Sequence, residues 1–102
     1  MKEITFEQLT NPLIERQFVF VHTPFCGTCK LARKLIEPLE SMEAIGTIYE
    51  MNASLQPQYM KDNFIKSVPC LLHLKKGEVA NKMYSFESVT NIYEHLTLWC
   101  ES

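Results

Sequence analysis

Apolar positions along the chain fall into short blocks whose spacing predicts strands and helices in alternation. Residues 17–23 (QFVFVHT) form a run that is β-branched and aromatic at its centre, which is typical of a strand buried on both faces. Residues 27–42 instead repeat apolar side chains at helical spacing, and Pro38 is expected to kink or split this helix near Lys34. The predicted apolar stripe of the helix consists of Leu31, Leu35, Leu39 and Met42.

The remaining segments complete the pattern. Thr5 and Gln8 have the spacing of a capping box, so a short helix is expected to end near Leu9. The segment Lys75-Lys76-Gly77-Glu78 separates two apolar runs and is typical of a hairpin with glycine in its turn. The other predicted elements are strands at 47–51, 70–74 and 79–84 and helices at 56–64 and 86–99. The last helix takes its apolar face from Val89, Ile92, Tyr93, Leu96 and Trp99.

The order of these elements defines a fold class. Strands that alternate with helices favour a parallel pair joined by crossover helices, and the closing hairpin adds an antiparallel edge. A length of 102 residues, 46% of them hydrophobic and 22% charged, suits one globular domain with one core. The prediction is a single α/β domain over residues 1–102, with a central mixed β-sheet flanked by α-helices.

Charge and hydropathy exclude two classes of partner. The 10 Lys and Arg residues are outnumbered by 12 Asp and Glu, for a formal net charge of −2, so a nucleic-acid partner is not expected. Acidic residues interrupt the N-terminal segment at once, and no run approaches the roughly 20 apolar residues that span a bilayer. A cytoplasmic protein without a membrane partner is therefore expected.

The segment Cys26-Gly27-Thr28-Cys29 carries the most specific chemistry, because it lies where a buried strand ends and a helix begins. Unpaired N–H groups and the helix dipole favour a thiolate at that position, and only a thiolate attacks a disulfide. Cys26 is expected to be the nucleophile, and Cys29, one turn deeper, to resolve the mixed disulfide. Gly27 leaves the surface open to a large substrate, and Thr28 is small enough to contact the sulfurs.

Metal binding is the main alternative for this motif, since CxxC also forms half of many zinc sites. Such a site needs two further ligands, and the sequence has no second CxxC and no HxxxH. Cys70 with a histidine could complete a site only through tertiary proximity. Neither a metal nor another cofactor is therefore expected.

A second motif, Ser67-Val68-Pro69-Cys70, opens a predicted strand. Proline at the first residue of a central strand is tolerated only in special circumstances, and a cis peptide bond is one of them. A cis Pro69 near the cysteines would leave the backbone of Val68 free to pair with an extended substrate. Without further information, an ordinary trans proline is the simpler interpretation.

Together these motifs resemble the thioredoxin family. Residues 18–39 resemble its active-site strand and helix, and the Val68-Pro69 motif with the following hairpin resembles its second half. The resemblance covers nearly all of the chain from 18 to 98. It implies a thioredoxin-like fold, usually a monomer, with Cys26 and Cys29 as the redox pair and Pro69 as a cis proline facing them. It also implies protein disulfide substrates and a reducing partner such as a thioredoxin reductase-like enzyme.

By the same resemblance, the substrate would be contacted by residues around the two motifs. These residues are Phe25, Gly27, Thr28, Val68 and Pro69.

The sequence departs from the thioredoxin pattern at several positions. Phe25 stands where thioredoxins carry Trp, and Gly27-Thr28 replaces Gly-Pro. Phe20 occupies the place of a buried Asp that assists proton transfer from the resolving thiol, and Glu50 aligns with the accompanying Lys. The glycine that follows the last strand is missing from Met83-Tyr84-Ser85. Deprotonation of Cys29 is then expected to need water, Glu50 or another base, and to slow resolution.

Other residues leave alternatives open. By the fold, Cys70 would lie near Cys26, where it could form another disulfide or ligate a metal, although burial as a small residue is more common. Cys100 is expected to be half-buried or an incidental surface thiol, and His22 either tunes a nearby thiolate or is a satisfied strand-edge residue. The alternative functions are a glutaredoxin-like reductase that uses glutathione, and a binding module whose cysteines are regulatory or ligate a metal.

Overall fold

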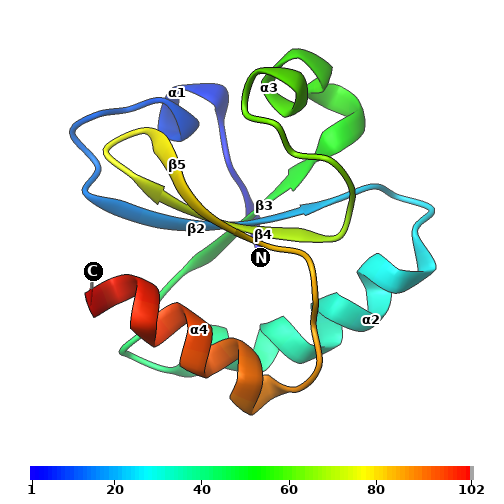
Figure 1. The fold of residues 1–102 in the computed structure, drawn as a ribbon, viewed down its shortest axis with the longest axis vertical. Helices are drawn as coiled ribbons and strands as arrows, with labels where there is room; N and C mark the ends of the chain where they lie inside the picture. The colour runs from blue at the N-terminus through cyan, green and yellow to red at the C-terminus, as the bar shows by residue number, and fades with distance from the viewer. Residues whose placement is uncertain (102) are drawn as a thin grey trace.

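The computed structural model describes residues 1–101 and contains a five-stranded mixed sheet in the order β1-β3-β2-β4-β5 (Figure 1). The strands are β1 (Lys2–Glu3), β2 (Arg16–His22), β3 (Ile48–Asn52), β4 (Cys70–Lys75) and β5 (Glu78–Met83). β3 runs parallel to both β1 and β2, whereas β4 is antiparallel to β2 and to β5. The predicted α/β class and mixed sheet are confirmed.

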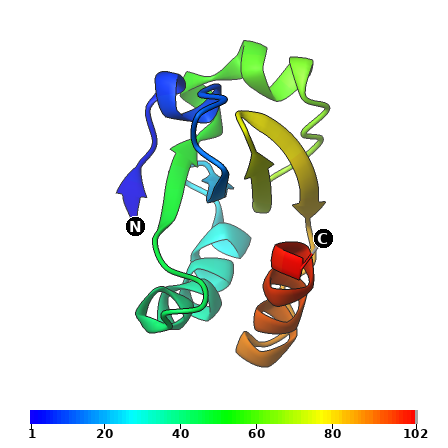
Figure 2. The same ribbon diagram turned by 90° about the vertical axis from the view of Figure 1, so that its left-hand side faces the viewer.

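Helices cover both faces of this sheet. α1 (Phe6–Leu9) and α3 (Pro57–Asp62) lie on one face, and α2 (Gly27–Ile36) and α4 (Val89–Glu101) lie on the other (Figures 1 and 2). Two short 3-10 helices, Glu37–Ser41 and Ala53–Leu55, follow α2 and β3. No helix in residues 1–101 combines the length and the apolar character needed to cross a membrane.

β2 divides the core into two layers. Phe18 and Phe20 point toward α2 and α4, while Val19 and Val21 belong to the layer beneath α1 and α3. All four side chains are buried, as the unbroken apolar run predicted. Because a strand alternates its side chains, β2 presents one apolar row to each helical layer.

α2 differs from its prediction in both its end and its buried face. It ends at Ile36 and continues as a 3-10 helix that contains Pro38, so the proline does interrupt the helix, but beyond Lys34. Leu31 is 64% exposed and Met42 is 37% exposed, so the expected apolar stripe was partly wrong. The face packed on the sheet is instead rotated by one position. It consists of Cys29, Ala32 and Ile36.

The chain ends also differ from the prediction. β1 was not expected, because two exposed residues carry no apolar pattern, yet they pair with Tyr49 and Glu50 of β3. The last helix begins at Val89 rather than at residue 86, since the Ser88 hydroxyl accepts the Asn91 N–H at 3.0 Å and caps the helix. The predicted capping box of Thr5 and Gln8 is present.

Candidate active site

Cys26 and Cys29 form a disulfide at the start of α2. Cys26 is the N-cap residue of the helix, with extended backbone angles, and its Sγ accepts the backbone N–H of Cys29 at 3.1 Å. The Thr28 Oγ1 lies 3.3 Å from the same sulfur and donates to it, since a bridged sulfur has no hydrogen. Two donors and the positive end of the helix dipole therefore converge on Cys26, which favours a thiolate there after reduction.

The two sulfurs differ in access. Cys29 is 3% exposed, whereas Cys26 is half-buried and is followed by exposed Gly27 and Thr28. A Cβ added at Gly27 would meet no atom within 4 Å, so the surface beside Cys26 is open. Phe25 is 99% exposed and buries almost nothing against its own chain. Cys26 is therefore the more accessible of the two sulfurs.

A groove of about 320 Å³ runs beside this disulfide. Thr28 and Pro69 line the same groove, so the structure brings the two sequence motifs together. The peptide bond between Val68 and Pro69 is cis, and both side chains are half-buried. The other lining residues are Leu31, Ala32, Leu35, Tyr84 and Phe86.

Tyr84 forms one wall of the groove, at the end of β5 where the sequence lacks the expected glycine. Its hydroxyl accepts the backbone N–H of Lys66 at 3.2 Å and so ties this wall to the segment that leads into Pro69. Tyr84 and Leu31 are groove residues that the sequence analysis did not assign. Leu31 follows the CxxC segment by two residues on α2 and Tyr84 follows β5, and neither position belongs to a motif.

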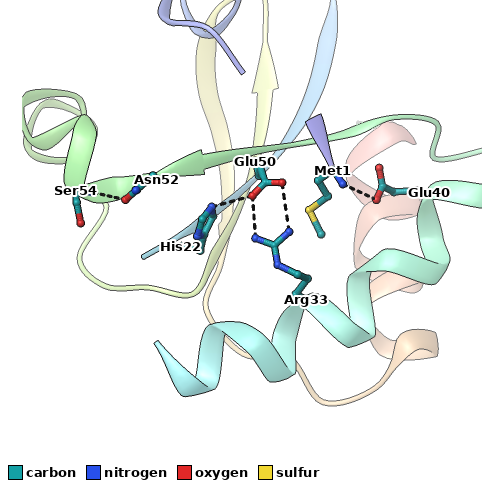
Figure 3. Close-up of polar contacts among 7 residues, drawn as sticks. All are labelled: Met1, His22, Arg33, Glu40, Glu50, Asn52 and Ser54. Carbon is teal, nitrogen blue, oxygen red and sulfur yellow. Dashed lines mark hydrogen bonds and ion pairs between the residues drawn. The ribbon is translucent and has the colours of Figure 1, made fainter. Parts of the chain in front are cut away.

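Glu50 lies at the centre of a polar cluster on the α2 face of the sheet (Figure 3). Its Oε1 accepts Arg33 NH2 at 2.9 Å and lies 3.0 Å from His22 Nε2, and its Oε2 accepts Arg33 NH1 at 3.3 Å. Burial raises the pKa of Glu50, but the hydrogen bond and charge of Arg33, with a smaller contribution from His22, outweigh it and leave the pKa below its ordinary value. Glu50 is therefore ionised at neutral pH.

The cluster surrounds Phe20, the residue that replaces the expected buried acid. Phe20 pairs with Glu50 across the β2–β3 ladder and is fully buried. The His22 ring stacks on the Phe20 ring at 5.8 Å, and the Arg33 guanidinium lies 5.3 Å from its centroid. The pairing of Arg33 with Glu50 was missed at the level of sequence, because the two residues come from different elements and share no motif.

Cys70 does not join the active site, although it follows Pro69. Its side chain enters the core layer beneath α1 and α3, whereas Cys26 and Cys29 belong to the opposite layer. The β2–β4 register pairs Cys70 with Val21, which faces away from α2, so the Cys70 thiol points to the layer opposite Cys29. Burial raises the pKa of Cys70 to about 11.

Within residues 1–101, no group of three or more His, Cys, Asp or Glu side chains is arranged to hold a metal ion. The structure thus offers Cys26 and Cys29 no third ligand in that part of the chain. Cys100 is a half-buried free thiol near the end of α4.

Comparison with solved structures identifies the fold. A thioredoxin of Malassezia sympodialis superposes with a TM-score of 0.76 at 18% identity, covering 91% of this chain and 81% of that one. A point-mutant thioredoxin of Halobacterium salinarum NRC-1 gives 0.75 at 12% identity, covering 95% and 86%. The oxidised thioredoxin of Plasmodium falciparum gives 0.73 at 14% identity, covering 97% and 98%. The chain thus has the thioredoxin fold.

Comparison of sequences identifies the family. The thioredoxin-like protein YusE of Bacillus subtilis (strain 168) is 35% identical over 94 residues, which cover 92% of this chain and 89% of that protein. No protein-family model matches the chain. On the strength of the relative, the chain belongs to the family of thioredoxin-like proteins.

Proposed function

We propose that this protein is a thiol–disulfide oxidoreductase that reduces or exchanges disulfides of other proteins through Cys26 and Cys29. The observation that carries the proposal is the position of Cys26: it caps α2, accepts the Cys29 N–H and is the more accessible of two cysteines at disulfide distance. A helix N-terminus both stabilises a thiolate and presents it to solvent.

The reaction follows from the different access of the two sulfurs. In the reduced protein, the Cys26 thiolate attacks a substrate disulfide, one substrate sulfur leaves with the electron pair, and a mixed disulfide forms. The Cys29 thiolate then attacks the Cys26 sulfur, the internal disulfide forms, and the second substrate sulfur leaves as a thiolate that takes up a proton. The substrate gains two electrons and the protein loses two. A reducing partner restores the dithiol.

Substrate binding is assigned to the surface around the disulfide. Phe25 offers an exposed aromatic face, and Gly27 and Thr28 leave the approach to Cys26 open. The backbone of Val68, next to Pro69 in the groove, is the candidate partner for an extended substrate segment.

The compartment and assembly state belong to the same proposal. Cys70 and Cys100 are free, which suits the reducing cytoplasm. A thioredoxin reductase-like enzyme is the proposed electron donor, and a monomer the proposed state.

Trapping tests the proposal against a binding role. A Cys29→Ser variant is expected to accumulate a mixed disulfide at Cys26 with a disulfide-containing protein substrate such as insulin, detected as a mass increase that dithiothreitol reverses. A Cys26→Ser variant, the matched control, is expected to trap nothing. Absence of adducts with Cys29→Ser would favour a binding module, while turnover with glutathione but not with a thioredoxin reductase would favour the glutaredoxin-like alternative.

A redox titration in dithiothreitol buffers complements the trapping experiment. A single two-electron transition assigned to Cys26 and Cys29 is expected between about −270 and −120 mV, the span of known dithiol oxidoreductases. Alkylation followed by mass measurement gives the reduced fraction at each potential. A pair that shows no transition in that span would not act as an exchange catalyst.

A further inference from the structure

Resolution of the mixed disulfide requires a group that removes the proton from Cys29. Only a thiolate attacks a disulfide, so the Cys29 thiol must be deprotonated in this step. Cys29 is 3% exposed, which leaves bulk water little access to its sulfur. Phe20 of β2, which shares a buried cluster with Cys29, is apolar and cannot accept a proton.

Figure 3 shows the His22–Glu50–Arg33 cluster of titratable side chains. The His22 ring and the Arg33 guanidinium of this cluster both contact the Phe20 ring. The other histidine on the α2 face of the sheet, His73, is paired across the sheet with Phe18 and stacks on Trp99 of α4. It therefore lies further back along β2, away from the strand end that leads to Cys26.

Within the cluster, the hydrogen-bond pattern leaves the Nδ1 of His22 as the nitrogen that can accept a proton. Both oxygens of Glu50 already accept hydrogen bonds or ion pairs, and an ionised carboxylate only accepts. The His22 Nε2, 3.0 Å from Glu50, therefore carries a hydrogen. In the neutral ring the remaining nitrogen, Nδ1, then holds the lone pair.

The cluster is also attached to β2, which leads into the CxxC segment, and to α2, which Cys26 caps and which contains Cys29. His22 ends β2 and lies about 7 Å along the strand from Phe20, on the same face and toward Cys26. Arg33 follows Cys29 by four residues on α2, a separation of about 6 Å along one face of the helix. Phe20, in contact with His22 and Arg33, shares a buried cluster with Cys29.

We propose that His22 accepts the proton of Cys29 when the mixed disulfide is resolved, with Glu50 and Arg33 as positioning residues that fix its ring. This inference rests on the proposed oxidoreductase function. Because position 20 holds phenylalanine, no carboxylic acid stands there to accept the proton. The inference assigns this role to His22, at the end of β2.

Protons and electrons balance in the proposed step. Neutral His22 takes the proton from Cys29 Sγ, directly or through one water, and becomes an imidazolium paired with Glu50. The Cys29 thiolate attacks Cys26 Sγ, the bond between Cys26 and the substrate sulfur breaks, and the electron pair leaves on that sulfur. The imidazolium returns its proton to the departing thiolate or to solvent, which restores neutral His22.

The two other members of the cluster are charged near neutral pH. β3 contributes Glu50 and α2 contributes Arg33, both charged throughout that range. The N-terminal ammonium group acts on Glu50, and Glu37 and Glu40 of the segment after α2 act on Arg33. None of these outer charges contacts His22 in the bonds described above.

A two-phase release assay tests the proposal. Reduced protein is mixed in a stopped-flow instrument with excess of a symmetric aromatic disulfide whose two halves absorb visible light only when each is released as a free thiolate. The first half is released when Cys26 attacks and the second when Cys29 resolves. His22→Gln is expected to slow the second release about 100-fold at neutral pH while the first stays within about twofold. His95→Gln, the same change at an exposed histidine of α4, is the matched control and is expected to alter neither.

The pH profile separates proton transfer from a structural role. As the pH rises, hydroxide takes over the ionisation of the Cys29 thiol, so the His22→Gln and wild-type rates of the second release are expected to converge at high pH. Glu50→Gln should slow the same phase by about 10-fold at neutral pH, since it frees the ring. Equal second-phase rates in His22→Gln and wild type, or a deficit that persists at high pH, would overturn the inference. Absence of the first release in the wild type would instead defeat the proposed function.

Discussion

A buried histidine should make this protein sensitive to mild acid. His73 is fully buried in β4, with its Nδ1 2.9 Å from Asn81 Oδ1 and its ring between Phe18 and Trp99. Its Nε2 is buried without a hydrogen-bond partner in the described residues. Burial lowers the pKa of His73, the nearby charges of Lys75 and Arg16 lower it further, and the Asn81 bond only partly compensates. The folded protein therefore holds His73 neutral.

The sign of the effect follows from proton linkage. The pKa of His73 is lower in the folded chain than the ordinary 6.5, so the unfolded chain binds a proton first as the pH falls. The stabilisation is complete above about pH 6.5 and is lost on acidification until the folded-state pKa is reached. Between neutral pH and pH 5 the loss amounts to at most about 2 kcal/mol, from roughly 1.36 kcal/mol per pH unit below 6.5.

Urea unfolding at neutral pH and at pH 5 measures this loss. The control variant is His73→Leu, because leucine suits the flanking positions of β4 and does not titrate. Wild type is expected to lose up to about 2 kcal/mol more than His73→Leu between the two pH values. Glu50 does not confuse the comparison, since its pKa lies below 4.5 and its titration falls outside the interval. Equal losses in the two proteins would refute the assignment of His73 as a neutral buried group.

Three further predictions concern other residues of the fold. At pH 8 only about one Cys70 thiol in a thousand is ionised, so iodoacetamide should label the oxidised native protein once, at Cys100, and the urea-unfolded protein twice, as counted by mass. Ile36→Ala should reduce the free energy of unfolding by about 2 to 5 kcal/mol, whereas Leu31→Ala on the exposed face should cost below about 1 kcal/mol. Tyr84→Phe removes a hydroxyl that accepts a backbone N–H, so urea unfolding should show a loss of about 1 kcal/mol.

The sheet and the redox motif could be predicted because their signals are local. The continuous run at 17–23 specifies a strand buried on both faces, and a CxxC segment that follows such a strand falls at a helix start. β1 carried no such signal, since its two residues are exposed and are held by pairing with β3. The apolar face of α2 was misplaced by one position because leucines at the groove mimic core leucines in spacing.

The side occupied by Cys70 illustrates what local pattern cannot supply. A shift of one residue in strand register moves every side chain of that strand to the other face. Cys70 pairs with Val21, and this places its thiol in the layer opposite the disulfide. Sequence identified Cys70 as near Pro69 along the chain, but its face is set by the ladder between β2 and β4, which is a tertiary property.

The Glu50 cluster is likewise set by tertiary structure, because its members are far apart in the sequence. His22, Arg33 and Glu50 come from β2, α2 and β3, and only the parallel pairing of β2 with β3 beneath α2 brings them together (Figure 3). Removing Glu50 alone would leave the half-buried Arg33 without its carboxylate, and removing Arg33 alone would leave Glu50 with only His22. Because α2 holds Cys26 at its cap, Cys29 one turn later and Arg33 a turn beyond, one rigid helix fixes the nucleophile, the resolving thiol and the cluster relative to one another.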